Sequence, residues 1–291
     1  MNLTWLIRAT GLLLLVFLVA GCNSSSSGNS SAEPDTSEET PGPEPGPEPG
    51  PEPGPEPGDG TAGSCFNSDL FASGTVWTIS LLTTGDGFES TNESTTTVDG
   101  PATFNGQSTI RLFGNSTSPE GATNFESFVG VEGQRSLVFG NVSEPTAPPE
   151  AAGTVVTTVN DPAYLRRFDL VAGQSYSQTY RQTVTVTSPL TGTLETGQTV
   201  ESEITFVGLE TVAVPAGTFI ACRFDEMETV TTDEGLLDIG GVQVPIPAVV
   251  TESESSTWIA VGNGLPVQST DEDSTTVMTA AQINGVPVSA P

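Results

Sequence analysis

Few side chains in this sequence could do acid–base or nucleophilic chemistry, and carboxylates dominate them. The chain has 36 aspartates and glutamates against seven arginines, with no histidine and no lysine. A Ser-His-Asp or Cys-His mechanism and a histidine metal site are therefore impossible. The missing lysine also excludes a Schiff base, a Ser-Lys dyad and a Walker-type phosphate loop.

A pair of carboxylates, as glycoside hydrolases use, is the catalytic arrangement that stays open. Glu201 and Glu203, and also Glu226 and Glu228, lie two residues apart, so each pair shares one face of an expected strand. Such neighbours are usually solvated positions at strand edges, and an acidic chain contains them by chance. We therefore expect no catalytic residue, no cofactor and no enzyme activity.

The acidic residues also raise the question of a calcium site, since calcium prefers oxygen ligands. The clusters Asp233-Glu234 and Asp271-Glu272-Asp273 lack the Asp-x-Asp-x-Asp-Gly spacing of a calcium loop, so the sequence assigns no metal ligand. The formal net charge of −29 instead suits the solvated surface of a salt-adapted bacterium. Such a charge repels phosphate backbones, so we expect no nucleic-acid partner.

The first 21 residues have the layout of an export signal. Arg8 precedes a leucine-rich run from Gly11 to Val19, which is shorter than the about 20 residues that span a bilayer. The run ends in Leu18-Val19-Ala20-Gly21-Cys22, which resembles the lipobox of bacterial lipoproteins. The resemblance implies cleavage after Gly21, diacylglycerol transfer to the Cys22 thiol and acylation of the new amino terminus. An ordinary signal peptide followed by a free cysteine is the alternative.

The lipobox predicts where the protein resides. Two or more acyl chains hold a protein firmly on a membrane, so a lipidated Cys22 is a stable anchor. Asn23 at the second mature position is compatible with outer-membrane sorting in lipoproteins of Gram-negative bacteria. We expect a protein of the cell envelope, anchored by lipid to the outer membrane.

Residues 22–63 are expected to form a disordered tether. From Pro41 to Gly58 the chain repeats Pro-Gly-Pro-Glu four times and ends in Pro-Gly. Glycine at every fourth position excludes a collagen triple helix, which needs it at every third. The prolines favour an extended path of at most roughly 55 Å. No aromatic or basic residue flanks them, so we interpret the repeat as a spacer rather than as a ligand for a Pro-binding partner.

Residues 64–291 are predicted to form an all-β domain, because alternation with a period of two recurs without convincing helical periodicity. Val200, Ile204 and Phe206, for example, share a face opposite Glu201 and Glu203. Turn signals such as Gly85-Asp86-Gly87 and Gly262-Asn263-Gly264 separate the strands. The pattern predicts an antiparallel meander of roughly a dozen strands that forms a curled sheet, an open barrel or a sandwich. Pro148-Pro149 marks a candidate subdivision near 147–153.

Besides Cys22, the chain has only Cys65 and Cys222, and both would be exported to an oxidising compartment. A disulfide between them is the economical interpretation, and it would tie the start of the domain to an interior strand. Two separate thiols are the alternative. No Cys-x-x-Cys motif is present to suggest a thioredoxin-like role.

Two segments are more specific than strand alternation. They are Val214-Pro215-Ala216-Gly217-Thr218-Phe219-Ile220-Ala221-Cys222 and Trp258-Ile259-Ala260-Val261-Gly262-Asn263-Gly264. Together they resemble a family of bacterial lipoproteins and periplasmic β-proteins that has no established activity. The resemblance covers about residues 160–270, implies curved antiparallel sheet and supplies no catalytic residue. From the residues themselves we expect a turn at Pro215, with Ile220, Cys222 and Phe224 facing inward and Trp258 covering one end of the core.

Three hypotheses of function follow. The first is a monomeric, non-enzymatic binding or structural module on a lipid-anchored stalk, whose partner is an envelope protein, a glycan or a lipid. The second is a carrier or chaperone for a hydrophobic ligand, which an unfilled apolar concavity would favour. The third is a carboxylate-dependent glycan hydrolase, which needs two carboxylates facing each other across a cleft.

Overall fold

The computed structural model describes residues 60–189, 192–239 and 242–289. Cys22 and most of the predicted tether lie outside these residues. The described residues form β-strands, short 3₁₀ helices and turns. The strands of the main sheet are β1 (Val76–Gly85), β2 (Phe88–Phe104), β3 (Gln107–Ser118), β4 (Gly121–Val131), β5 (Arg135–Ala147), β6 (Val155–Arg167), β7 (Gln174–Ser188), β8 (Gly192–Val214), β9 (Gly217–Thr232), β12 (Val250–Ala260), β13 (Pro266–Thr270), β14 (Ser274–Ile283) and β15 (Val286–Pro287).

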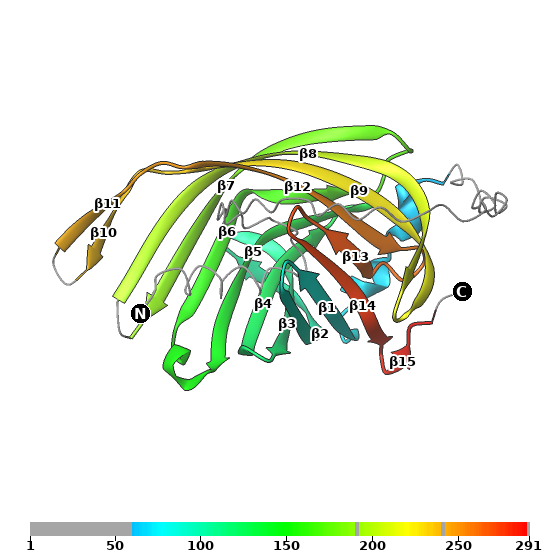
Figure 1. Ribbon diagram of the computed structural model, residues 1–291, viewed down its shortest axis with the longest axis horizontal. Coiled ribbons are helices and arrows are strands. Elements are labelled where there is room, and N and C mark those ends of the chain that lie inside the picture. Colours follow the sequence, from blue (N-terminus) through cyan, green and yellow to red (C-terminus); the bar gives the residue numbers. More distant parts are fainter. Residues whose placement is uncertain (1–59, 190–191, 240–241, 290–291) are drawn as a thin grey trace, which may run out of the picture.

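The main sheet is an antiparallel meander that closes on itself (Figure 1). Neighbours in sequence pair from β1 to β9, and β12, β13 and β14 follow in order. β14 then pairs with β1, from Trp77 opposite Ile283 to Gly85 opposite Ser274, which makes a closed barrel of 12 strands with β15 as an extra strand. The all-β meander is confirmed, and of the arrangements expected the barrel is the one observed, closed rather than open.

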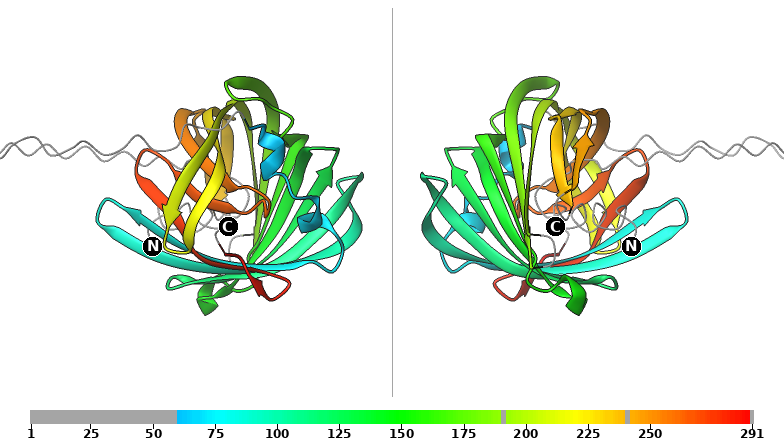
Figure 2. Two further views of the ribbon diagram at one scale, coloured as in Figure 1. Left: turned by 90° about the vertical axis from the view of Figure 1, so that its right-hand side faces the viewer. Right: turned by 90° about the vertical axis from the view of Figure 1, so that its left-hand side faces the viewer.

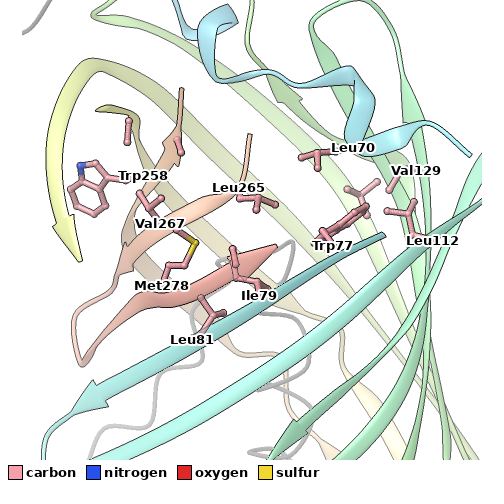
Figure 3. Packing of buried hydrophobic residues seen from close by; sticks show 14 of the residues in the cluster. Leu70, Trp77, Ile79, Leu81, Leu112, Val129, Trp258, Leu265, Val267 and Met278 are labelled. Carbon is pink, nitrogen blue, oxygen red and sulfur yellow. The ribbon is translucent and has the colours of Figure 1, made fainter. Parts of the chain in front are cut away.

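Alternation of side chains along the strands explains the barrel interior. In β1, Trp77, Ile79, Leu81 and Thr83 are buried and the residues between them are more exposed. Not every inward position is apolar, because buried threonines and serines recur beside the leucines and valines. The interior therefore contains polar side chains, and its buried apolar residues form two clusters; part of the larger one is drawn in Figure 3.

Irregular positions let the long strands curve into a barrel. The pairing register shifts at Gly100, Gly140 and Gly208, each next to a residue left without a partner across the ladder. Such bulges bend a strand and increase its twist. At Gly140 the φ angle is 156°, and a Cβ there would lie 2.1 Å from the carbonyl oxygen of Thr158, so only glycine fits.

The chain enters the barrel through two short 3₁₀ helices, η2 (Ala62–Cys65) and η3 (Ser68–Phe71). Figure 2 shows this segment in blue within the outline of the strands. Thr61 forms a bridge with Val171, and Ala62 is fully buried. The fold thus begins slightly before Ser64, because Thr61 and Ala62 pack against the β6–β7 connection.

The β8–β9 hairpin turns at Pro215-Ala216, as predicted, and its end folds over β14, where the Ala216 N–H donates to the Met278 carbonyl. This geometry corrects the expectation for Ile220, which is 48% exposed instead of inward-facing. Cys222 and Phe224 are buried as expected. Near the hairpin end the opposite face of β9 is covered, so Phe219 becomes core in place of Ile220.

The remaining strands, β10 (Gly235–Ile239) and β11 (Val242–Ile246), pair only with each other. They project beyond the barrel at the left of Figure 1. The segment 147–153, where the sequence suggested a subdivision, contains the 3₁₀ helix η4 (Pro149–Ala151) and joins β5 to β6 within the main sheet. Across the described ranges, no helix is both long and apolar enough to cross a membrane.

Candidate functional site: a cavity inside the barrel

A cavity of about 130 Å³ lies inside the barrel beneath the η2–η3 segment. Its walls come from that segment, from β1, β5 and β6, and from β12 to β14 with their connections. The apolar part of the wall is formed by Leu70, Phe71, Trp77, Ile79, Leu81 and Val138. Hydroxyl and amide side chains, among them Ser136, Gln268 and Thr276, contribute a smaller polar part. The arrangement is an apolar pocket with a few polar groups, which is typical of sites for small molecules.

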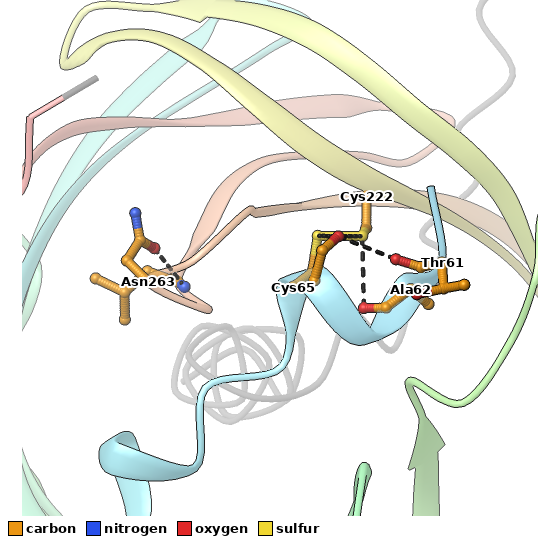
Figure 4. The surroundings of a disulfide bond; sticks show 7 residues. Thr61, Ala62, Cys65, Cys222 and Asn263 are labelled. Carbon is orange, nitrogen blue, oxygen red and sulfur yellow. Dashed lines mark hydrogen bonds between the residues drawn. A yellow bond between two sulfur atoms is a disulfide. The ribbon is translucent and has the colours of Figure 1, made fainter. Parts of the chain in front are cut away.

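The predicted Cys65–Cys222 disulfide is present and fixes one side of this cavity (Figure 4). The two Cα atoms are 6.2 Å apart, and Cys222 is fully buried on β9. Cys65 itself lines the cavity. The bond therefore holds the η2–η3 segment, which is one wall of the cavity, against the interior of the barrel.

The β12–β13 connection holds the other side of the same segment. The Asn67 amide donates to the Asn263 carbonyl at 3.1 Å, and the Gly262 N–H donates to the Ser64 carbonyl at 2.9 Å. Asn263 also uses its side-chain oxygen to accept the Leu265 N–H at 2.8 Å (Figure 4). The predicted Gly262-Asn263-Gly264 turn is thus observed, and it docks onto the N-terminal segment.

Trp258 is a core residue, as predicted, and is 8% exposed. Its indole nitrogen donates to Glu210 at 2.7 Å, and the Arg223 guanidinium lies 5.2 Å from its ring centroid. Since indole carries one N–H donor, both polar and apolar parts of the side chain are satisfied. Trp258 is not among the residues that line the cavity.

A buried polar cluster borders the apolar cavity. Arg166, whose side chain is 12% exposed, donates from Nη2 to the Tyr164 hydroxyl at 2.8 Å and to Glu226 Oε2 at 3.3 Å. Tyr164 in turn donates to Glu226, at 3.2 Å from Oε2. Tyr164 and Arg166 line the cavity, whereas Glu226 does not. Arg166 is the only charged residue that the described chain contributes to the cavity wall.

Burial controls the protonation of this cluster. Burial lowers the pKa of Arg166, but Tyr164 and Glu226 raise it by more, so the guanidinium keeps its charge. Burial raises the pKa of Glu226, although Arg166 and Tyr164 oppose the change. Burial, and next the charge of Glu226, raises the pKa of Glu228 to about 7.

The two carboxylate pairs that the sequence singled out differ in their burial. Glu201 and Glu203 are exposed on the outer face of β8, as expected for solvated positions. Glu226 and Glu228 are 6% and 7% exposed and face the interior, so their interpretation as solvated edge residues is wrong. They alternate with the exposed Met227 on β9, in line with the buried Phe224. The two carboxylates are neighbours on one strand and do not face each other across a cleft.

Arg166 and Tyr164 were not predicted from the sequence. The available signal was their spacing. Tyr164, Arg166 and Phe168 occupy every second position, so their side chains share a face, and the two aromatic residues are buried in the structure. An arginine between two aromatic residues on one face of a strand is an interior candidate. Its partner Glu226 lies on β9, far away in sequence, and nothing local connects the two.

The acidic clusters form no metal site in the part of the chain that the structure describes. Asp271 caps the β13–β14 turn, where its side chain accepts the N–H groups of Asp273 and Ser274 at 2.9 Å and 2.7 Å. Asp233 forms an ion pair with Arg181 on the surface.

No family model matches this chain, and no curated protein matches it. Two solved structures are similar to it at low sequence identity. A Bacteroides fragilis protein described as exported and as having a YmcC-like fold is 13% identical and aligns over 72% of this chain and 96% of its own, with a TM-score of 0.41. A Parabacteroides distasonis protein described as a lipoprotein is 12% identical and aligns over 73% of this chain and 96% of its own, with a TM-score of 0.37.

Proposed function

We propose that this protein is a lipid-anchored protein of the cell envelope whose barrel is a non-enzymatic module that binds a small molecule with an apolar body. Ligand binding is inferred from the cavity of about 130 Å³ beneath the η2–η3 segment, which has Leu70, Trp77 and Ile79 in its wall. An apolar cavity of about 150 Å³ is large enough for benzene. The cavity therefore fits a small molecule, or a short alkyl segment of a larger one, and favours a carrier over a purely structural module.

The anchor is supported by the sequence. Leu18-Val19-Ala20-Gly21-Cys22 has the lipobox pattern, and the Pro-Gly-Pro-Glu repeat that follows suits a spacer between the membrane and Gly60. Asn23 supports the outer membrane as the destination. Radiolabelled palmitate should label the wild-type protein but not Cys22→Ala, and that variant should leave the membrane fraction. Unlabelled wild-type protein, or a variant that stays on the membrane, would remove the anchor from the proposal.

Native mass spectrometry of the protein purified from its own host tests the ligand. We expect a bound small molecule in the wild type and its loss in Val138→Phe, because the added phenyl group occupies the cavity. Val129→Phe is the matched control, since Val129 is also buried, at 1% exposed against 6% for Val138, but does not line the cavity. Wild-type protein that carries no ligand, or equal occupancy in both variants, would contradict the proposal.

A further inference from the structure

We propose that the cavity selects ligands with a single carboxylate, which the Arg166 guanidinium binds while the apolar body fills the space beside Trp77 and Ile79. This inference rests on the proposed function and adds the chemical class of the ligand. It starts from the fact that, in the described cavity wall, Arg166 is the only charged side chain. No aspartate or glutamate of the described residues reaches that wall.

Arg166 has hydrogen-bonding capacity that the protein does not use. A guanidinium carries five N–H donors, and both of the bonds to Tyr164 and Glu226 come from Nη2. The N–H groups on Nε and Nη1 have no hydrogen-bonding partner among the described residues. Neither nitrogen is fully buried, so this edge of Arg166 is open and can donate to an acceptor supplied from outside the protein.

The internal partner of Arg166 is a weak one. The distance of 3.3 Å from Nη2 to Glu226 Oε2 exceeds the about 2.7–2.9 Å of a strong charge-assisted hydrogen bond. Only one nitrogen of the guanidinium reaches Glu226, so the pair is not bidentate. The fork geometry that arginine offers to a carboxylate is therefore still available to a ligand.

Two aromatic rings hold the guanidinium in place. Its Cζ atom lies 5.6 Å from the centroid of Phe224 and 5.9 Å from that of Tyr164. Such contacts favour a desolvated cation and restrict its rotamers. A positioned arginine loses little conformational entropy when it binds a planar carboxylate, which is a form of preorganisation.

The negative charge of the whole chain does not exclude an anionic ligand. Charges on the protein surface are screened over about 8 Å at physiological ionic strength. Arg166 acts at contact distance in a cavity whose other wall residues are uncharged. The net charge of −29 should slow the approach of an anion at low salt, but it does not remove the contact between the bound carboxylate and Arg166.

A comparison of matched ligands tests the proposal. Hexanoate and 1-hexanol share their body and differ in the carboxylate, as do benzoate and benzyl alcohol, so the two pairs also separate alkyl from aromatic ligands. We expect the wild-type barrel to bind one of the acids at least about tenfold more tightly than its alcohol in equilibrium titrations. Val138→Phe should abolish binding of both members of that pair, which places them in the cavity.

Substitutions in the cluster separate recognition from folding. Glu226→Gln keeps Arg166 and removes the competing carboxylate, so binding of the acid should tighten. Arg166→Gln combined with Glu226→Gln removes both members of the ion pair, so neither is left as an unpaired charge, and the preference for the acid should disappear while the alcohol still binds. Arg167→Gln is the control, because Arg167 pairs with Asp169 at the surface and does not line the cavity.

The outcomes distinguish the two proposals. Equal affinity for acid and alcohol in the wild type would overturn the role of Arg166, while the binding function would stand. A neutral or cationic molecule that co-purifies with the protein would do the same. If no ligand co-purifies and none of the four compounds binds, the proposed function fails together with this inference.

Discussion

At the scale of single residues, the least usual feature is the Glu228 carboxyl group. It is 7% exposed and has no hydrogen-bonding partner among the described residues. Proteins seldom bury a carboxylate without a partner, because removing the charge from water is strongly unfavourable. The group responds by holding its proton, and its pKa rises from 4.5 to about 7.

This shift predicts a stability that falls with rising pH. Because the folded state binds the proton more tightly, the contribution of Glu228 is fully present below pH 4.5 and is lost as the pH rises through about 7. Glu228→Gln should raise the free energy of unfolding at pH 8 by up to about 3 kcal/mol and flatten its pH dependence. Urea denaturation at several pH values measures both effects.

Glu201→Gln is the control for the loss of one negative charge, since Glu201 is exposed on the outer face of the barrel. Part of the slope should persist in Glu228→Gln, because burial raises the pKa of Glu226 in the same direction. A pH profile that is identical in wild type and Glu228→Gln would show that Glu228 is solvated.

At the scale of elements, the η2–η3 segment depends on the bond between Cys65 and Cys222. The segment contributes few backbone hydrogen bonds, but it supplies Cys65, Leu70 and Phe71 to the cavity wall. The bond joins residues 157 positions apart in sequence. In the chain-entropy model a loop of this length stabilises the folded state by roughly 5 kcal/mol at most.

Replacing both cysteines by serine should therefore lower the free energy of unfolding by several kcal/mol. It should also release residues 60–75 to proteases before the barrel itself unfolds, because this segment is held to β9 by the disulfide. Limited proteolysis with mass mapping measures the second effect. Wild-type protein treated with a reductant should behave in the same way, and a protected segment in both samples would contradict the prediction.

Most strands and turns could be predicted from the sequence, because alternation has a period of two and turn residues interrupt it. The side to which Ile220 points could not be predicted. Its strand alternates as expected, but the end of the β8–β9 hairpin folds over β14, and this decides which face of the strand is covered. Closure of the barrel depends on pairing between β1 and β14, which lie at opposite ends of the domain. The contact of Arg166 with Glu226 also joins residues far apart in sequence, so local sequence patterns could not predict the polar part of the candidate site.

At the scale of the whole molecule, negative charge dominates. Each of the six arginines in the described residues, Arg111, Arg135, Arg166, Arg167, Arg181 and Arg223, already pairs with a carboxylate. Most of the remaining acidic groups face solvent without a positive neighbour. Self-repulsion of this kind destabilises a compact state, and salt screens it.

The protein should therefore become more stable as sodium chloride rises from about 0.05 M to 1 M, where the Debye length falls to about 3 Å. A rise of a few degrees in the thermal unfolding midpoint is the expected result, measured by circular dichroism. The same concentration range of a non-ionic osmolyte serves as the control for effects other than screening. A midpoint that falls with salt would show that the ion pairs outweigh the repulsion.

The bond between Cys65 and Cys222 also determines how the molecule bears mechanical load. A force applied through the chain before Gly60 reaches Cys65 within a few residues and passes directly into β9. The polypeptide between the two cysteines is bypassed, so it cannot lengthen under tension while the bond is intact. Only the part after Cys222 can be drawn out, at about 3.3–3.6 Å per residue. A barrel held by its N terminus would thus keep β1 to β8 joined as one covalent ring while the rest is pulled apart.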